Sequence, residues 1–257
     1  MKLIFLGDIV GSPGRKAVKD FLPELLRRYK PDFIIANGEN AAGGYGITEK
    51  IAEELFTYGI HIITTGNHVW KKEFLPYLQK TDRVLRPANY GPSAPGKGWT
   101  IFNRENLKLG IINLEGRIFM RPLENPFLVA KDLARRILEE TPYIIVDFHA
   151  EATSEKMAMG YFLDGLISAL VGTHTHVQTS DERILPQGSA YITDVGMCGP
   201  VESVIGMKIN QALELYVTMV GKKLEVETQG PLKVEGVYLE LNSNGKAQSI
   251  ERFRLIS

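Results

Sequence analysis

The stretch His61-Ile62-Ile63-Thr64-Thr65-Gly66-Asn67-His68 joins an apolar strand to a polar tripeptide. An amide and an imidazole at the end of a buried strand are costly to remove from water unless they bind something, and a phosphate linked to a metal would serve. Taken alone, an Asn-His pair is most often a plain turn, because Asn, Gly and His all tolerate loop geometry. The residues at the other strand ends decide between these two interpretations.

The first part of the chain alternates short apolar stretches, typical of strands, with amphipathic stretches, typical of helices. The predicted strands are residues 2–6, 32–36 and 60–64, and the predicted helices are residues 14–29 and 48–58. We expect Pro23 to bend or split the first helix. This βαβαβ alternation predicts parallel strands joined by right-handed crossovers.

Three polar clusters follow these strands, namely Asp8, Glu39-Asn40 and Asn67-His68. In open sheets of parallel strands, ligands bind outside the carboxyl ends of the strands. We therefore expect the three clusters to converge at one edge of the sheet.

In the rest of the chain, the regular alternation of strands and helices ends. This part contains a predicted hairpin over 99–114 that turns near Glu105-Asn106, a helix over 127–139, a strand over 143–148 and an apolar run over 166–171. Extended runs follow at 190–193, 223–228, 233–242 and 249–256, with Asn244-Gly245 as the turn between the last two. We expect these last runs to form a second, largely antiparallel sheet packed on the first, and residues 1–257 to form a single domain.

The composition is that of an ordinary globular protein, with 44% hydrophobic and 23% charged residues. Thirty basic residues balance thirty acidic ones, which argues against electrostatic capture of bulk nucleic acid. The single cysteine, Cys198, cannot form an internal disulfide, and we expect it to be a small buried hydrophobic residue. The chain begins with a strand and shows neither a signal peptide nor a membrane span, so we expect a cytoplasmic protein.

Four of the five histidines, His68, His149, His174 and His176, lie at predicted strand ends, whereas His61 opens a strand and is interpreted as structural. On an extended segment, residues two apart face the same way, about 6.6 Å apart at roughly 3.3 Å per residue. His174 and His176 can therefore approach one site, with one histidine for each of two metals about 3.5–4 Å apart. Imidazole, carboxylate and amide ligands together favour Mn, Fe, Zn or Ni over Ca or Mg.

The order of these clusters resembles the calcineurin-like metallophosphoesterase superfamily. The motifs that carry this resemblance are Asp8, Gly38-Glu39, Gly66-Asn67-His68, the isolated His149, and Gly172-Thr173-His174-Thr175-His176. Within that superfamily, four stretches are similar to the YmdB-type bacterial phosphodiesterases, namely residues 7–11, 38–44, 147–156 and 193–197. The resemblance covers essentially the whole chain.

The resemblance implies a four-layer α/β/β/α sandwich, in which helices flank two mixed sheets, and a site for two transition-metal ions, with iron favoured over Mn, Zn or Ni. It implies that Asp8, Glu39, Asn40 and His176 hold one metal. Glu39 would bridge to the second, held also by Asn67, His149 and His174. The chain departs from the wider superfamily at three positions: Val10 stands where a histidine is usual, Glu39 where an aspartate bridges, and Val69 where an acidic residue often follows Asn-His.

The implied reaction is hydrolysis of 2′,3′-cyclic nucleotides to nucleoside 3′-phosphates, with a hydroxide that bridges the metals as nucleophile. We expect His68 to protonate the leaving ribose oxygen, since histidine side chains titrate near neutral pH, although a role in orienting a ligand stays open. Arg117 and Arg121 contact phosphate or are solvated surface residues.

Two other functions stay open: a phosphomonoesterase or protein phosphatase on the same metal core, and a regulatory binding protein that acts through an RNA-processing partner. The sequence also leaves open a homo-oligomer.

Overall fold

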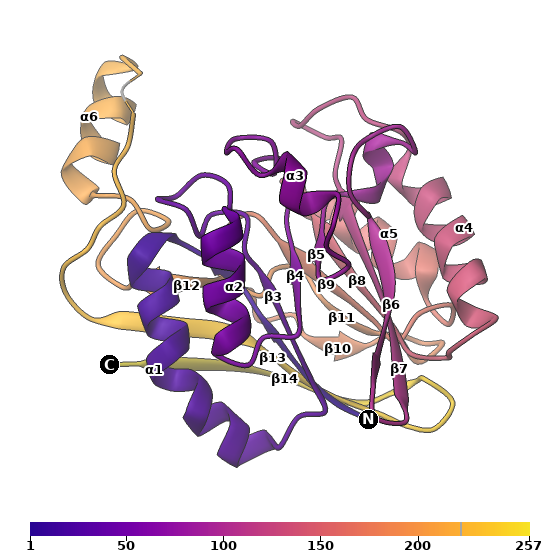
Figure 1. Cartoon of the computed structure of the whole chain (residues 1–257). Coiled ribbons are helices and arrows are strands. Elements are labelled where there is room, and N and C mark those ends of the chain that lie inside the picture. Colours follow the sequence, from indigo (N-terminus) through magenta and orange to yellow (C-terminus); the bar gives the residue numbers. More distant parts are fainter. Residues whose placement is uncertain (222) are drawn as a thin grey trace.

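The computed structural model describes residues 1–221 and 223–257, which form two mixed β-sheets packed face to face with helices on both outer faces (Figure 1). The helices are α1 (Gly11–Tyr29), α2 (Glu49–Thr57), α3 (Leu75–Leu78), the 3₁₀ helix η1 (Ala88–Tyr90), α4 (Pro126–Leu138), α5 (Thr153–Leu163) and α6 (Ile209–Thr218). This arrangement confirms the four-layer sandwich. Within the described residues, no helix is both long and apolar enough to cross a membrane.

The first sheet has the strand order β2-β12-β13-β1-β3-β4-β5, with β14 paired to β13. Its strands are β1 (Lys2–Leu6), β2 (Asp8–Ile9), β3 (Phe33–Asn37), β4 (Ile62–Thr64), β5 (Val84–Leu85), β12 (Met197–Pro200), β13 (Leu232–Leu241) and β14 (Ala247–Ile256). The strands β1, β3, β4 and β5 run parallel, as the βαβαβ alternation predicts. β13 pairs antiparallel with β1 and makes the sheet mixed.

The second sheet has the order β10-β11-β9-β8-β7-β6. Its strands are β6 (Trp99–Arg104), β7 (Leu107–Glu115), β8 (Ile144–His149), β9 (Ala169–Thr173), β10 (Arg183–Ile184) and β11 (Ala190–Ile192). The central strands β7, β8, β9 and β11 are parallel, and only the outer pairs are antiparallel. The hairpin of β6 and β7 turns at Glu105 and Asn106 as predicted.

The prediction that the last extended runs form a second, largely antiparallel sheet is wrong. β13 and β14 join the first sheet, and β11 joins the parallel centre of the second. Almost every residue of β13 is buried, so its sequence carries no clean alternation that would show which sheet it enters. The run at 223–228 forms no named strand, and Val226 makes an isolated bridge to Met207.

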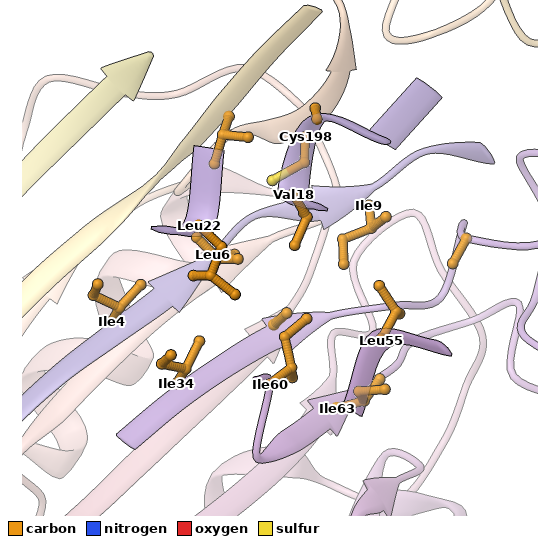
Figure 2. Close-up of a cluster of buried hydrophobic side chains, with 14 of the residues drawn as sticks. Ile4, Leu6, Ile9, Val18, Leu22, Ile34, Leu55, Ile60, Ile63 and Cys198 are labelled. Atoms are coloured by element: carbon orange, nitrogen blue, oxygen red, sulfur yellow. The ribbon is translucent and has the colours of Figure 1, made fainter. Parts of the chain in front are cut away.

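Alternation along the strands divides the core into three layers. Leu3 and Phe5 of β1 point between the two sheets, whereas Ile4 and Leu6 point to the helical face covered by α1 and α2. Figure 2 shows this outer cluster, in which Leu6 packs with Leu22 of α1. On the opposite side of the molecule, α4 and α5 cover the second sheet. Cys198 is buried, as expected.

Helix α1 starts three residues before the predicted position and continues through Pro23 without splitting. The buried face of α1 packs on β12 and β13. This packing stabilises the helix and offsets the local free-energy cost of the proline. Helices α5 and α6 are absent from the predicted elements. The weak amphipathic pattern of α5 explains why it gives no helix signal in the sequence.

His61 is structural, as predicted. Its Nδ1 accepts a hydrogen bond from the backbone N–H of Ile34 at 2.9 Å, and its ring packs edge-on against Phe33. Burial, together with the nearby Arg104 and Arg83, lowers the pKa of His61 to about 4. This histidine is therefore neutral at physiological pH and serves as a hydrogen-bond acceptor within the sheet.

Candidate active site

The predicted site residues lie together at the carboxyl ends of strands from both sheets. Asp8 begins β2, Glu39 and Asn40 follow β3, Asn67 and His68 follow β4, His149 ends β8, and His174 and His176 follow β9. The expected convergence at one edge is therefore present, and it includes the second sheet as well. The fully buried members are Asp8, Glu39 and His149.

One group of atoms surrounds His149. Its Nε2 lies 2.9 Å from Glu39 Oε1, 3.0 Å from His174 Nδ1 and 3.1 Å from Asn67 Oδ1. Ligand atoms of Glu39, His149 and His174 all lie within 4.8 Å of one another, so these three residues could hold a metal ion. Asn67 is placed to add an amide oxygen.

A second group contains Asp8, Asn40 and His176. Asp8 Oδ1 lies 3.5 Å from His176 Nε2, and Asn40 Nδ2 lies 3.1 Å from the same nitrogen and 3.5 Å from Glu39 Oε1. Glu39 thus lies between the two groups. Asn40 Oδ1 faces His68 Nδ1 at 2.9 Å, so the Asn40 amide must turn over before its oxygen can bind a metal in this group.

The three imidazoles of these groups are oriented alike. Each turns one nitrogen outward to an acceptor: His149 Nδ1 to Thr173 Oγ1 at 2.8 Å, His174 Nε2 to Glu151 Oε2 at 3.0 Å, and His176 Nδ1 to the Ile205 carbonyl at 2.8 Å. An outward N–H leaves the other nitrogen of each ring to present a lone pair inward. The inward nitrogens and two buried carboxylates form a donor set that suits transition metals.

Thr173, Asp147 and Asn37 hold His149 in place. The Thr173 hydroxyl accepts from His149 and donates to Asp147 Oδ1 at 2.7 Å, while Asn37 Nδ2 donates to Asp147 Oδ2 at 3.0 Å. Burial raises the pKa of Asp147 to about 6. The sequence reasoning missed these three residues. Asp147 was detectable, since it stands two residues before His149 and so faces the same side of β8.

The electrostatics of the site favour a bound cation. Burial alone would raise the pKa of Glu39, but the imidazoles of His149 and His68 outweigh burial and hold it well below its ordinary range. Burial would lower the pKa of His149, but Glu39, Asp8 and Asp147 raise it to about 9. Burial and the neighbouring His149 lower the pKa of His174 to about 3. A bound cation can take the place of the proton on His149 and balance the negative charge of the same carboxylates.

The prediction that His174 and His176 lie on an extended segment is wrong. β9 ends at Thr173, and the two histidines have φ values of 103° and 64°, in the left-handed region that side chains with a Cβ rarely adopt. This turn sends His174 to His149 and His176 to Asp8. Such local strain concentrates at functional sites.

Gly66 allows β4 to approach the site closely. A Cβ at this position would lie 2.1 Å from His149 Cδ2 and 2.4 Å from Glu39 Oε2. The glycine of the Gly66-Asn67-His68 tripeptide is thus required by packing against two site residues, which a plain turn would not require.

His68 lies beside the two groups and outside their centres. Its Nδ1 contacts Asn40 Oδ1 at 2.9 Å, its backbone N–H donates to Glu39 Oε2 at 3.1 Å, and its ring packs edge-on against Tyr45. Over residues 1–221 and 223–257, no hydrogen bond engages His68 Nε2. This nitrogen is available to a substrate.

Arg117 and Arg121 are exposed in the loop that follows β7. Arg121 donates to the Tyr90 hydroxyl at 3.2 Å, and Tyr90 donates to Glu115 Oε2 at 2.9 Å. Because β7 pairs with β8 and Glu115 lies opposite His149, this loop borders the site.

The comparison with known protein families agrees with this geometry. The family model described as YmdB-like protein matches residues 4–253. The chain belongs to the YmdB-like family. A 2′,3′-cyclic-nucleotide 2′-phosphodiesterase of Bacillus subtilis (strain 168) is 48% identical over 254 residues, which covers 98% of this chain and 96% of that protein.

Two crystal structures share the fold of this YmdB-like chain over its whole length. One, described as a novel phosphatase from Mycoplasma pneumoniae, has a TM-score of 0.92 and 39% identity, and 93% of it is covered. The other, a hypothetical protein from Thermus thermophilus, has a TM-score of 0.91 and 38% identity, and 99% of it is covered.

A buried ion pair supports the turn that carries both histidines in this YmdB-like chain. Lys156 and Asp194 are fully buried, and Lys156 Nζ lies 2.8 Å from Asp194 Oδ2. The same carboxylate accepts from the Thr175 backbone N–H at 3.0 Å and from the Thr175 hydroxyl at 2.8 Å. Both residues belong to the stretches that carry the family resemblance, and the structure gives them a positioning role.

Replacing Lys156 by methionine should destabilise the fold by about 3–5 kcal/mol, because it leaves the charge of the buried Asp194 carboxylate without an opposite charge beside it. Urea unfolding measures this loss. Lys108→Met is a matched control, since Lys108 pairs with Glu140 at 3.0 Å on the surface and its loss should change stability little. Equal destabilisation by the two substitutions would show that the buried pair has no special role.

Proposed function

We propose that this YmdB-like protein is a metal-dependent phosphodiesterase that hydrolyses 2′,3′-cyclic nucleotides to nucleoside 3′-phosphates. The observation that carries the proposal is the set of three imidazoles, each held from outside by an acceptor and turned with its free nitrogen toward buried carboxylates. The name of the Bacillus subtilis relative supports the substrate class and the regiochemistry.

The proposed cofactor is a pair of transition-metal ions, iron in preference to Mn, Zn or Ni. Asp8, Glu39, Asn40 and His176 would hold one ion; Glu39, Asn67, His149 and His174 would hold the other. Once bound, the ions would offset the charge of the phosphodiester and lower the pKa of a water molecule toward neutrality.

His68 is the proposed general acid. Once the Asn40 amide turns over to bind the metal, its N–H would donate to His68 Nδ1, and the ring proton would then lie on Nε2, from which it can pass to the leaving ribose oxygen. The alkoxide of ribose is a poor leaving group, so the proton must arrive as the P–O bond breaks. Glu39 also accepts from the His68 backbone N–H, so the acid and the carboxylate between the two groups are linked directly.

Separation of reaction products tests the proposal. We expect the metal-loaded protein to convert 2′,3′-cyclic nucleotides to nucleoside 3′-phosphates, as judged by chromatography against both isomers. Accumulation of the 2′-phosphate would overturn the regiochemistry. Turnover of phosphomonoesters with no reaction on cyclic nucleotides would replace the proposal by a phosphatase. An inert protein that retains its metals would favour a regulatory binding protein.

We also propose that residues 1–257 act as one domain, because the hydrophobic layer between the two sheets receives side chains from β1 near the start and β13 near the end. We also propose a cytoplasmic location. Its support is the single cysteine, Cys198, which cannot form a disulfide within the chain, whereas proteins of oxidising compartments often contain disulfides.

A further inference from the structure

Trp70 and Tyr90 bring two aromatic rings together beside the candidate active site. The centroids of the two rings are 5.4 Å apart, and the ring planes meet at 83°. Both side chains are partly exposed. Trp70 lies in the turn that follows β4, and Tyr90 is the last residue of η1, so two separate segments form the pair. We call this pair of rings the aromatic corner.

The aromatic corner lies next to the proposed general acid. Trp70 stands two residues after His68, and the Lys71 N–H donates to the His68 carbonyl at 2.9 Å, which closes the turn between them. Trp70 also packs against the hydrophobic cluster on the outer face of the first sheet. The turn and this packing hold the indole ring close to a ligand that meets His68.

Glu115 and Arg121 hold the other ring of the corner. The Tyr90 hydroxyl donates to Glu115 Oε2 at 2.9 Å and accepts from Arg121 at 3.2 Å. Burial and the neighbouring Glu115 raise the pKa of Tyr90, so the hydroxyl keeps the proton that it donates. Asn89, which precedes Tyr90, exchanges two more hydrogen bonds with the backbone of Glu115, at 2.8 and 2.9 Å. The Tyr90 ring is therefore fixed in position from both sides.

Glu115 also connects the aromatic corner with the proposed metal ligands. It lies opposite His149 in the parallel pairing of β7 with β8, and neighbouring strands are about 4.8 Å apart. Its second oxygen, Oε1, is buried and has no hydrogen-bond partner in the part of the chain that the structure describes. An unpaired polar atom in the interior costs stability, so stability does not explain its presence. The corner is thus one side chain away from the group of atoms around His149.

We propose that the aromatic corner binds the base of the nucleotide substrate. The proposal rests on the proposed function, which supplies the class of ligand. In a 2′,3′-cyclic nucleotide the ribose separates the base from the cyclic phosphate, just as Glu115 separates Tyr90 from His149. A flat base can stack on one ring and meet the edge of the other, since aromatic rings favour both arrangements. Because every base has a face that can stack, the corner favours substrates that carry a base and discriminates little among bases.

Paired substrates test the proposal. Ethylene phosphate has the same strained cyclic diester as a 2′,3′-cyclic nucleotide but carries no base. Trp70→Leu should lower kcat/KM for cyclic nucleotides by about 5- to 150-fold, chiefly through KM, and leave the reaction of ethylene phosphate unchanged. Trp99→Leu is the matched control, because Trp99 lies in β6 and packs on the cluster beneath α4 and α5. This control should change neither reaction.

Fluorescence gives a second readout that does not depend on catalysis. The chain contains two tryptophans, so Trp99→Phe leaves Trp70 as the single fluorophore and Trp70→Phe leaves Trp99. Adenosine 3′-phosphate should quench the fluorescence of Trp70 in the first variant along a saturating curve. It should leave the fluorescence of Trp99 in the second variant unchanged, and inorganic phosphate should quench neither.

The two readouts separate this proposal from the proposed function. Saturable quenching of Trp70 in a protein that hydrolyses no cyclic nucleotide would support the aromatic corner as a base site, and the proposed function alone would fail. No quenching, or equal quenching of Trp70 and Trp99, would overturn the corner as a base site even in an active phosphodiesterase. An equal loss on both substrates in Trp70→Leu, or an unchanged kcat/KM for cyclic nucleotides, would overturn it as well.

Discussion

Replacing Glu39 by glutamine should remove most of the bound metal and abolish turnover of cyclic nucleotides. Glu39 is fully buried, and its Oε1 lies 2.9 Å from His149 Nε2 and 3.5 Å from Asn40 Nδ2, so one carboxylate contacts both groups of candidate ligands. Glutamine keeps the shape and removes the charge. Elemental analysis of desalted protein should show a fall from about two ions per chain, the content expected of a two-metal site.

Glu235→Gln is the control for this substitution. Glu235 is also a buried glutamate, but it pairs with Lys233 at 2.7 Å on β13 and belongs to neither group of ligands. We expect this variant to keep both its metals and its activity. Unchanged metal content in Glu39→Gln would contradict the assignment of Glu39 as the shared ligand, and full activity after chelation would refute a metal-dependent reaction altogether.

Replacing His68 by alanine should slow hydrolysis of 2′,3′-cyclic nucleotides by about 10²–10⁴-fold while the metal content is unchanged. The ribose oxygen leaves as an alkoxide unless it receives a proton, whereas p-nitrophenolate leaves without one. The same substitution should therefore cost much less with bis-p-nitrophenyl phosphate. The ratio of the two rate losses measures proton donation separately from metal binding, because loss of a metal would slow both reactions.

His61→Asn provides the matched histidine control, since His61 accepts a backbone hydrogen bond in the sheet and lies outside the site. It should leave both rates unchanged. Equal losses on the two substrates in His68→Ala would remove the general-acid role, and a loss of metal would make His68 a ligand.

The convergence of these candidate residues was predictable because the information is local. Asp8, Glu39 and Asn67 each follow a short apolar run, and the carboxyl ends of adjacent parallel strands must meet at one edge. Which strands belong to each of the two sheets was harder to predict from the sequence. β13 is buried on both faces, so its sequence does not show that it pairs with β1. The pairing depends on contacts between residues far apart in the chain, such as Lys2 and Glu240.

The family, the order of the candidate ligand types and the βαβαβ half of the fold can be read from the sequence, since motif spacing and side-chain periodicity are properties of short stretches. The way in which His174 and His176 reach different groups depends on the folded chain, because Asp8 and Asp194 from other segments hold their left-handed turn. The same holds for the pairing of Lys156 with Asp194, which needs a desolvated interior that neither residue creates alone.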